Sequence, residues 1–176
     1  MFVLGVDPGL THCGYGVVSR TGRHLEAVAA GVVRTDPSTD LAVRLAELHG
    51  EMGALVEEYQ PDEGAVERVL FQVNVRSAMQ TGQASGVVMA AAAAAGCPVA
   101  LYSPNEVKNA VAGWGGADKD QVEQMVRGQL GITARLRPVD AADAVAVALC
   151  HLAMVPPIRR VAGTGAIESA TSVASR

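Results

Sequence analysis

The order in which strand-like and helix-like segments follow one another is the feature that most constrains the fold of this chain. Three Val-rich segments with glycine at their borders come first and are typical of strands in hairpin connection. The expected strands are residues 2–7, 14–19, 24–34, 63–70 and 99–102, and the expected helices are 41–56, 74–96 and 140–154, with two short helices around a glycine-rich loop at 113–116. This order predicts an α/β protein with a five-stranded mixed sheet and helices on both faces.

The first expected helix is amphipathic. Its apolar residues recur every three to four positions, and charged residues between them give the helix a polar face. The apolar set is Leu41, Leu45, Leu48, Met52, Leu55 and Val56, and the charged set is Arg44, Glu47, Glu51 and Glu58.

The composition fits one cytosolic domain. The 176 residues are enough for a single core, and because only 3% are aromatic, Val, Leu and Ala must fill most of it. The apolar run from Gly86 to Leu101 is too short to span a bilayer and is expected to be a buried helix.

No secretory signal is recognisable, so we expect a cytoplasmic protein with one domain at 1–155 and a mobile tail at 156–176. Widely spaced cysteines are expected to be reduced core thiols, namely Cys13, Cys97 and Cys150.

Four acids stand where a sheet and a helix end or begin. Asp7 closes the first strand, where open α/β sheets place ligands, although Asp-Pro-Gly is also an ordinary turn. Glu67 lies on a strand with apolar neighbours and needs a partner or a metal ion there, unless it faces water or pairs with Arg68. Asp140 and Asp143 share one face of the last helix, and the same spacing suits helix capping. Together the four carboxylates suit Mg²⁺ or Mn²⁺.

Positive charge is scarce but concentrated. The formal net charge is −4, which counts against broad contact with nucleic acid, yet an acidic protein can carry a local basic face. Two lysines, Lys108 and Lys119, lie on either side of the glycine-rich loop, and they fit both phosphate contact and ordinary surface positions. Trp114 in that loop fits either stacking on a base or anchoring of the loop. Further positive charge in the surrounding segments comes from Arg76, Arg127, Arg135 and Arg137.

From about residue 3 to residue 154 the chain resembles the RuvC family of Holliday junction resolvases. The matching stretches, in family order and at family spacing, are Gly5-Val6-Asp7-Pro8-Gly9-Leu10, Gly14-Tyr15-Gly16-Val17, Pro61-Asp62, Val66-Glu67, Asn74, Ser77-Ala78, Gly82-Gln83-Ala84, Gly86, Val107-Lys108, Gly113, Gly115, Ala117, Lys119, Gln121-Val122 and Asp140-Ala141-Ala142-Asp143-Ala144. The resemblance implies a ribonuclease H-like fold and a metal-dependent endonuclease that resolves four-way DNA junctions by paired symmetric nicks. It also implies that the protein acts in recombination and repair, together with a RuvA and RuvB branch-migration complex.

The resemblance assigns roles to individual residues. The family's catalytic and metal-binding acids fall on Asp7, Glu67, Asp140 and Asp143, which would hold Mg²⁺ or Mn²⁺, with two ions expected per site. Its DNA-contacting residues fall on Lys108 and Lys119, and we add Arg76 and Phe71. Members often carry a stacking aromatic three residues after the catalytic glutamate. Here that position is Leu70, and Phe71 follows it.

A two-fold symmetric homodimer is expected, because two symmetric nicks require two active sites. The long helix at 74–96 offers small residues from Ala90 to Ala95 and apolar Val87 to Met89 for such a contact. The same helix must also pack on its own sheet.

Three other functions fit parts of the sequence. Asp7 to Thr11 also satisfies the phosphate loop of actin-like and sugar-kinase ATPases, but those proteins need two such domains, and this chain is too short for them. A catalytically weak junction-binding module would bind without metal and cut poorly. A related resolvase-like nuclease acting on RNA would prefer structured RNA to junction DNA.

Overall fold

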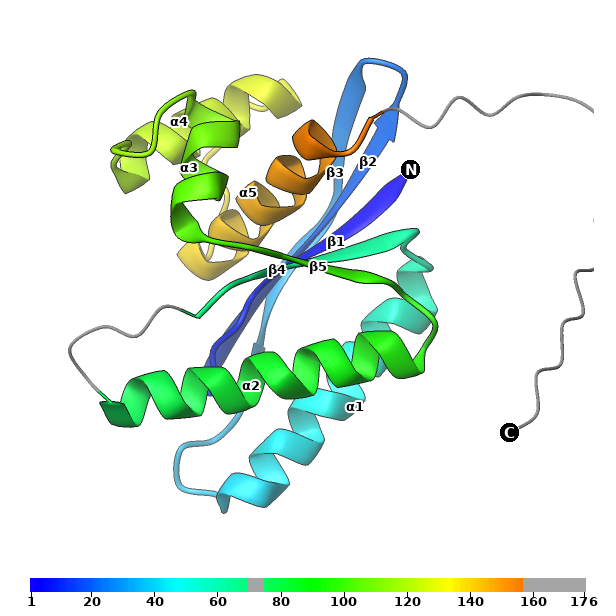
Figure 1. The fold of residues 1–176 in the computed structure, drawn as a ribbon, viewed down its shortest axis with the longest axis vertical. Coiled ribbons are helices and arrows are strands. Elements are labelled where there is room, and N and C mark those ends of the chain that lie inside the picture. The colour runs from blue at the N-terminus through cyan, green and yellow to red at the C-terminus, as the bar shows by residue number, and fades with distance from the viewer. Residues whose placement is uncertain (70–74, 157–176) are drawn as a thin grey trace, which may run out of the picture.

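The computed structural model describes residues 1–69 and 75–156. Leu70, Phe71 and nearly all of the expected tail therefore lie outside the described residues. In chain order the elements are β1 (Phe2–Asp7), β2 (His12–Thr21), β3 (His24–Arg34), α1 (Leu41–Tyr59), β4 (Glu63–Glu67), α2 (Val75–Ala94), β5 (Val99–Tyr102), α3 (Pro104–Ala112), α4 (Lys119–Leu130) and α5 (Val139–Met154) (Figure 1).

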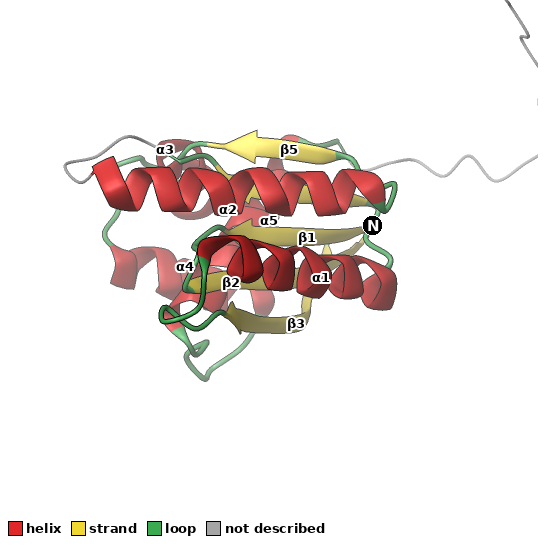
Figure 2. Cartoon of the chain, turned by 90° about the horizontal axis from the view of Figure 1, so that it is seen from below, coloured by secondary structure: helices red, strands yellow, loops and turns green. Residues whose placement is uncertain are grey.

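The strands form one mixed sheet in the order β3-β2-β1-β4-β5. The first three strands are antiparallel neighbours, whereas β4 runs parallel to both β1 and β5. Figure 2 looks onto the face covered by α1 and α2, with α5 behind the sheet. The predicted α/β class, the five strands and the helices on both faces are thus confirmed.

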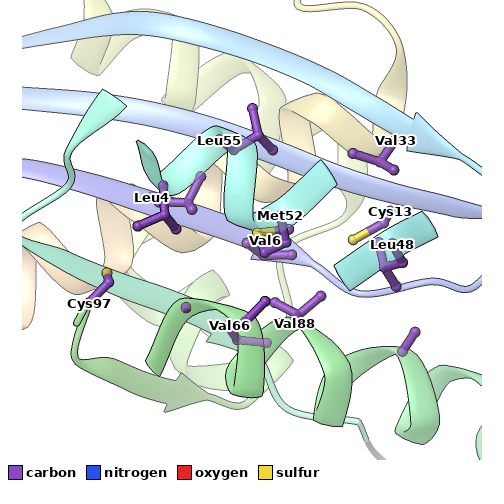
Figure 3. Close-up of a cluster of buried hydrophobic side chains, with 14 of the residues drawn as sticks. Leu4, Val6, Cys13, Val33, Leu48, Met52, Leu55, Val66, Val88 and Cys97 are labelled. Carbon is purple, nitrogen blue, oxygen red and sulfur yellow. The ribbon is translucent and has the colours of Figure 1, made fainter. Parts of the chain in front are cut away.

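Two cores follow from the alternation of side chains along the strands. Leu4 and Val6 point toward α1 and α2, where they meet Leu48, Met52 and Val88 (Figure 3). Val3 points to the other face and packs with residues of α3, α4 and α5. All three cysteines are buried and free, as expected.

Three glycines let α5 lie directly on the sheet. A Cβ added at Gly14 would overlap the backbone of Asp140, and one added at Gly5 would overlap the backbone of Ala144. At Gly16 it would meet the side chain and backbone of Val145. The first turn of α5 is therefore held close to the strand ends that carry Asp7.

Some sequence-based bounds were wrong. The fourth strand ends at Glu67 rather than at residue 70, although the Arg68 N–H still donates to the Tyr102 carbonyl at 2.7 Å. The alanine-rich helix is buried along one face only, since Ala91 and Ala92 are buried while Ala90 is exposed. None of the helices in the described ranges combines the length and apolarity that crossing a membrane would require.

The largest correction concerns Arg44. Its place between apolar residues predicted a position on the polar face of α1, but only 5% of the residue is exposed. The reason is that the end of β3 and the loop after β1 pack over the start of this helix and offer the arginine hydrogen-bond acceptors.

Candidate active site

Asp7 and Glu67 end two neighbouring parallel strands. Val6 of β1 is in register with Val66 of β4, so the residues that follow them reach the same edge of the sheet. Both side chains are half-buried. The parallel pairing of β1 and β4 is therefore enough to bring Asp7 and Glu67 to the same edge of the sheet.

The start of α5 brings the other two acids to this edge. The N-cap of the helix is Pro138, and no side chain caps it with a hydrogen bond. Asp140 lies in the first turn and Asp143 one turn further on. The capping interpretation of this pair, which the sequence left open, therefore finds no support in the structure.

A pocket of about 390 Å³ opens at the sheet edge. Its polar lining combines three of the four acids with both lysines, and its apolar lining comes from α3, α4 and α5. The lining residues are Asp7, Glu67, Pro104, Val107, Lys108, Lys119, Val122, Asp143 and Ala146. Asp140 does not line the pocket, but its charge acts on Asp7.

The two lysines come from helices with firmly fixed starts. Lys108 lies in α3, where the Ser103 hydroxyl and the Glu106 carboxylate form a reciprocal capping box. Lys119 is the first residue of α4, which begins with a second capping box between Asp118 and Gln121. These two caps set the positions from which the lysines reach the pocket.

Burial and mutual repulsion make the acids costly to ionise. Burial first, and then the charges of Glu67, Asp143 and Asp140, raise the pKa of Asp7 to about 7, while Lys119 opposes the shift. The pKa of Glu67 is also raised, by burial and by Asp143. A cation among these carboxylates would relieve both effects.

Lys119 supplies part of that positive charge. Its Nζ donates to Asp143 Oδ2 at 3.0 Å, and this contact raises the pKa of the lysine. The side chain is otherwise 78% exposed, so it is anchored at its tip and free along its stem. Lys108 acts at longer range and lowers the pKa of Glu67.

The donor set fits a hard divalent ion. Carboxylate oxygens are the ligands that Mg²⁺ and Mn²⁺ prefer, and among the described residues no ion pair involves the desolvated Asp7 carboxylate. Within the described ranges, no three Asp, Glu, His or Cys side chains are already drawn together to ligand distances. Like charges repel, and Asp143 is paired with Lys119, so a cation would be needed to draw these carboxylates together.

The remaining candidates lie apart from the pocket lining. Arg76 is exposed at the start of α2, and Phe71 falls outside the described residues. Trp114 is 54% exposed, and its ring covers Gly116 so closely that a Cβ there would overlap it. The indole therefore folds back on its own loop, which favours anchoring over an extended stacking position.

The sequence reasoning missed the apolar part of the pocket, to which Val107 and Val122 contribute. Val122 follows Lys119 by three positions and so lies on the same side of α4, which was a usable signal, whereas Val107 is adjacent to Lys108 and its spacing gave none.

Comparison with known proteins gives one family. The model described as Crossover junction endodeoxyribonuclease RuvC matches residues 3–151. The crossover junction endodeoxyribonuclease RuvC of Salinispora arenicola is 54% identical over 153 residues, which cover 86% of this chain and 87% of that protein.

Solved structures agree with this result. The structure of Thermus thermophilus RuvC has a TM-score of 0.82 at 39% identity, covering 87% of this chain and 94% of that one. The same protein in complex with a Holliday junction substrate also has a TM-score of 0.82 at 39% identity, with coverage of 86% and 93%. The yeast mitochondrial Holliday junction resolvase shares the ribonuclease H-like fold at a TM-score of 0.64 and 16% identity, with coverage of 86% and 78%. The chain belongs to the RuvC family of crossover junction endodeoxyribonucleases.

Proposed function

We propose that this enzyme resolves four-way DNA junctions by paired symmetric nicks, using divalent ions held by Asp7, Glu67, Asp140 and Asp143. The observation that carries the proposal is the pocket at the carboxyl edge of β1 and β4, where three of these acids meet both lysines. Family membership supports the reaction class and a need for a divalent metal ion.

The acids divide the work of holding the ions. Asp7 is the central ligand, because the charges of the other three acids all act on it. Glu67 faces it from the neighbouring strand, and Asp143 and Asp140 come from α5. Two Mg²⁺ or Mn²⁺ ions bound there supply Lewis-acid activation of water and stabilise the charge that develops on the leaving 3′ oxygen.

The lysines bind the phosphates on either side of the scissile bond. In the metal-free protein Lys119 neutralises Asp143. If Asp143 held an ion, the Lys119 ammonium would be available to a phosphate oxygen. Lys108, which also lines the pocket, adds a second positive charge. Contacts of this kind to phosphate do not depend on the base sequence.

The enzyme works as a two-fold symmetric dimer, with α2 as the contact. The face of α2 opposite its buried residues carries an exposed stripe of apolar and small side chains. Two of these are large and well exposed, Val75 at 70% and Met79 at 59%. We call this set the α2 stripe, and it consists of Val75, Met79, Gly82, Gly86, Ala90 and Ala93. In an isologous contact each residue of the stripe is used twice.

The proposal has further parts, of which only the work with RuvA and RuvB follows from family membership. Arg76, exposed beside the α2 stripe, contacts junction DNA, and Phe71 or Leu70 stacks on a junction base. The enzyme acts in the cytoplasm with RuvA and RuvB. Residues 1–155 form the nuclease domain, and a tail follows from 156.

A labelled four-way junction and a matched duplex, each incubated with and without Mg²⁺, test the function. The expected result is a pair of symmetric nicks in the junction, only with Mg²⁺, and an intact duplex. Tight junction binding without cleavage would instead identify a binding module. Faster cleavage of a structured RNA than of the junction would identify an RNA nuclease.

A further inference from the structure

Arg44 is a buried cation in an unfavourable place. It lies in the first turn of α1, where the positive end of the helix dipole disfavours a positive side chain, and only 5% of it is exposed. In the part of the chain that the structure describes, none of the ion pairs involves Arg44. The charge of Arg44 does act on the Asp36 carboxylate, whose pKa it helps to lower, but only as the weakest of the causes that act there. Burial of a charge without a close ion pair is costly, so the hydrogen bonds of Arg44 must compensate for most of it.

Those hydrogen bonds tie three segments together. Arg44 Nε donates to the Thr35 hydroxyl at 2.9 Å, and Nη2 donates to the Thr11 hydroxyl at 2.8 Å. The Thr35 hydroxyl in turn donates to the Leu10 carbonyl at 2.6 Å. A backbone bond from Thr35 N to Thr11 O, at 3.3 Å, closes the group. Charged donors strengthen such a chain of bonds, and α1, the end of β3 and the loop after β1 are thereby joined.

The loop held in this way leads directly out of Asp7. Only residues 8–11 separate β1 from β2, and Asp7 pairs with Gly14 across that connection. Glu67, Asp140 and Asp143 repel the Asp7 carboxylate. Because the loop is short, a change in the position of Leu10 or Thr11 would act on backbone only three or four residues from Asp7.

We infer that Arg44 is a positioning residue for the metal site, which holds the loop after Asp7 through Thr11 and Thr35 and so keeps the Asp7 carboxylate in the pocket. The inference rests on the proposed role of Asp7 as a metal ligand. None of Arg44, Thr11 and Thr35 lines the pocket, so the group acts through the backbone and not by contact with an ion or DNA.

The test is a calorimetric titration of Mn²⁺ into the full-length protein without DNA. Arg44→Met removes the donors, and Thr11→Val removes one acceptor while leaving Arg44 and Thr35 in place. Residues that orient metal ligands change metal affinity by roughly 10- to 100-fold. We expect Mn²⁺ affinity to fall by about that range in Arg44→Met, by about tenfold in Thr11→Val, and by less in Arg44→Lys, which keeps a donor.

Arg20→Met is the matched control. Arg20 is another arginine whose guanidinium joins separate segments of the chain. It donates to the backbone carbonyls of Leu152 and Val155, at the far end of α5 from Asp140. Its loss should lower the melting temperature without changing Mn²⁺ affinity.

Wild-type Mn²⁺ affinity in Thr11→Val and in folded Arg44→Met, with a fall in melting temperature like that of Arg20→Met, would overturn the inference. If Arg44→Met does not fold, Thr11→Val alone decides. A wild-type protein that binds no Mn²⁺ would overturn the proposed metal site itself. Equal Mn²⁺ binding by wild type and variants would overturn only the role of Arg44, so the two failures can be told apart.

Discussion

At Asp7 the cost of burying a carboxylate adds to the repulsion of three neighbouring acids. Its pKa of about 7 lies well above the ordinary 3.8, so the folded, metal-free protein holds a proton there more tightly than the unfolded chain does. The stability that this proton contributes is fully present below pH 3.8 and is lost as the pH rises through about 7.

We therefore expect Asp7 to give the metal-free protein a stability that declines between pH 4 and pH 8. Urea unfolding in the presence of a chelator, at several pH values, measures this decline. Asp7→Asn, which cannot ionise, should flatten the curve and raise it most at the alkaline end. Parallel curves for wild type and variant would contradict the shifted pKa.

Lys108 and Lys119 are expected to supply phosphate contacts. Changing both to Ala should weaken junction binding, reduce cleavage and lower the slope of log affinity against log salt by about 0.9 for each lysine. The double variant should remain folded because Lys119 is largely exposed.

Arg23→Ala is the control for the lysine pair, since Arg23 is exposed in the turn between β2 and β3, at the opposite edge of the sheet from the pocket. An unchanged affinity, rate and salt slope in the double lysine variant would make both lysines ordinary surface residues.

The sequence predicted some site residues better than others. Asp7 ends the first strand both in the sequence-based prediction and in the structure, whereas the fourth strand was expected to run to residue 70 and to leave Glu67 inside it. Asp140 and Asp143 remained ambiguous between capping and ligation, since the choice depends on Pro138 taking the N-cap position. Arg44 was misplaced, because helical periodicity describes one helix and carries no information on what packs over its first turn.

At the scale of elements, α5 and α2 cover opposite faces of the sheet and contribute differently to function. Gly5, Gly14 and Gly16 allow α5 to lie against the sheet, which brings its two acids to the strand ends. α2 uses Ala84, Val88 and Ala91 to cover the other face and leaves the α2 stripe outward. The sequence predicted both helices by period. It did not predict that glycines in strands, which contribute no packing side chains, are the contact surface for α5.

A charge on the α2 stripe should split the dimer. Ala90→Glu keeps a good helix former and adds two like charges across a two-fold axis. Light scattering should give a dimer for wild type and a monomer for the variant, with the fold intact by circular dichroism. The variant should lose paired nicking.

Gln124→Glu, at an exposed position of α4 away from the α2 stripe, should leave the dimer unchanged. A monomeric wild-type protein at concentrations where it still makes paired nicks would contradict the role of α2.

At the scale of the whole molecule, the protein is acidic although its substrate, DNA, is a polyanion, so the position of its few lysines matters more than its net charge. The net charge is −4, yet the only two lysines line the same pocket as the acids. Metal ions bound there would turn this acidic cluster into a site that tolerates a phosphate. The fold was predictable because strand order and periodicity repeat over many residues. The positions of Lys108 and Lys119 relative to the acids could not be predicted from the sequence, because they depend on how α3 and α4 pack against α5.

The most direct test is cleavage of a labelled four-way junction by the variants Asp7→Asn, Glu67→Gln, Asp140→Asn and Asp143→Asn, beside the control Glu57→Gln on the exposed surface of α1. Each site variant keeps the shape of the side chain and removes a ligand charge. The account predicts that all four bind the junction while their cleavage rates fall by orders of magnitude, and that the control cuts normally. A near wild-type cleavage rate in any of the four would contradict its role as a metal ligand, and such a rate in Asp7→Asn would contradict the account as a whole.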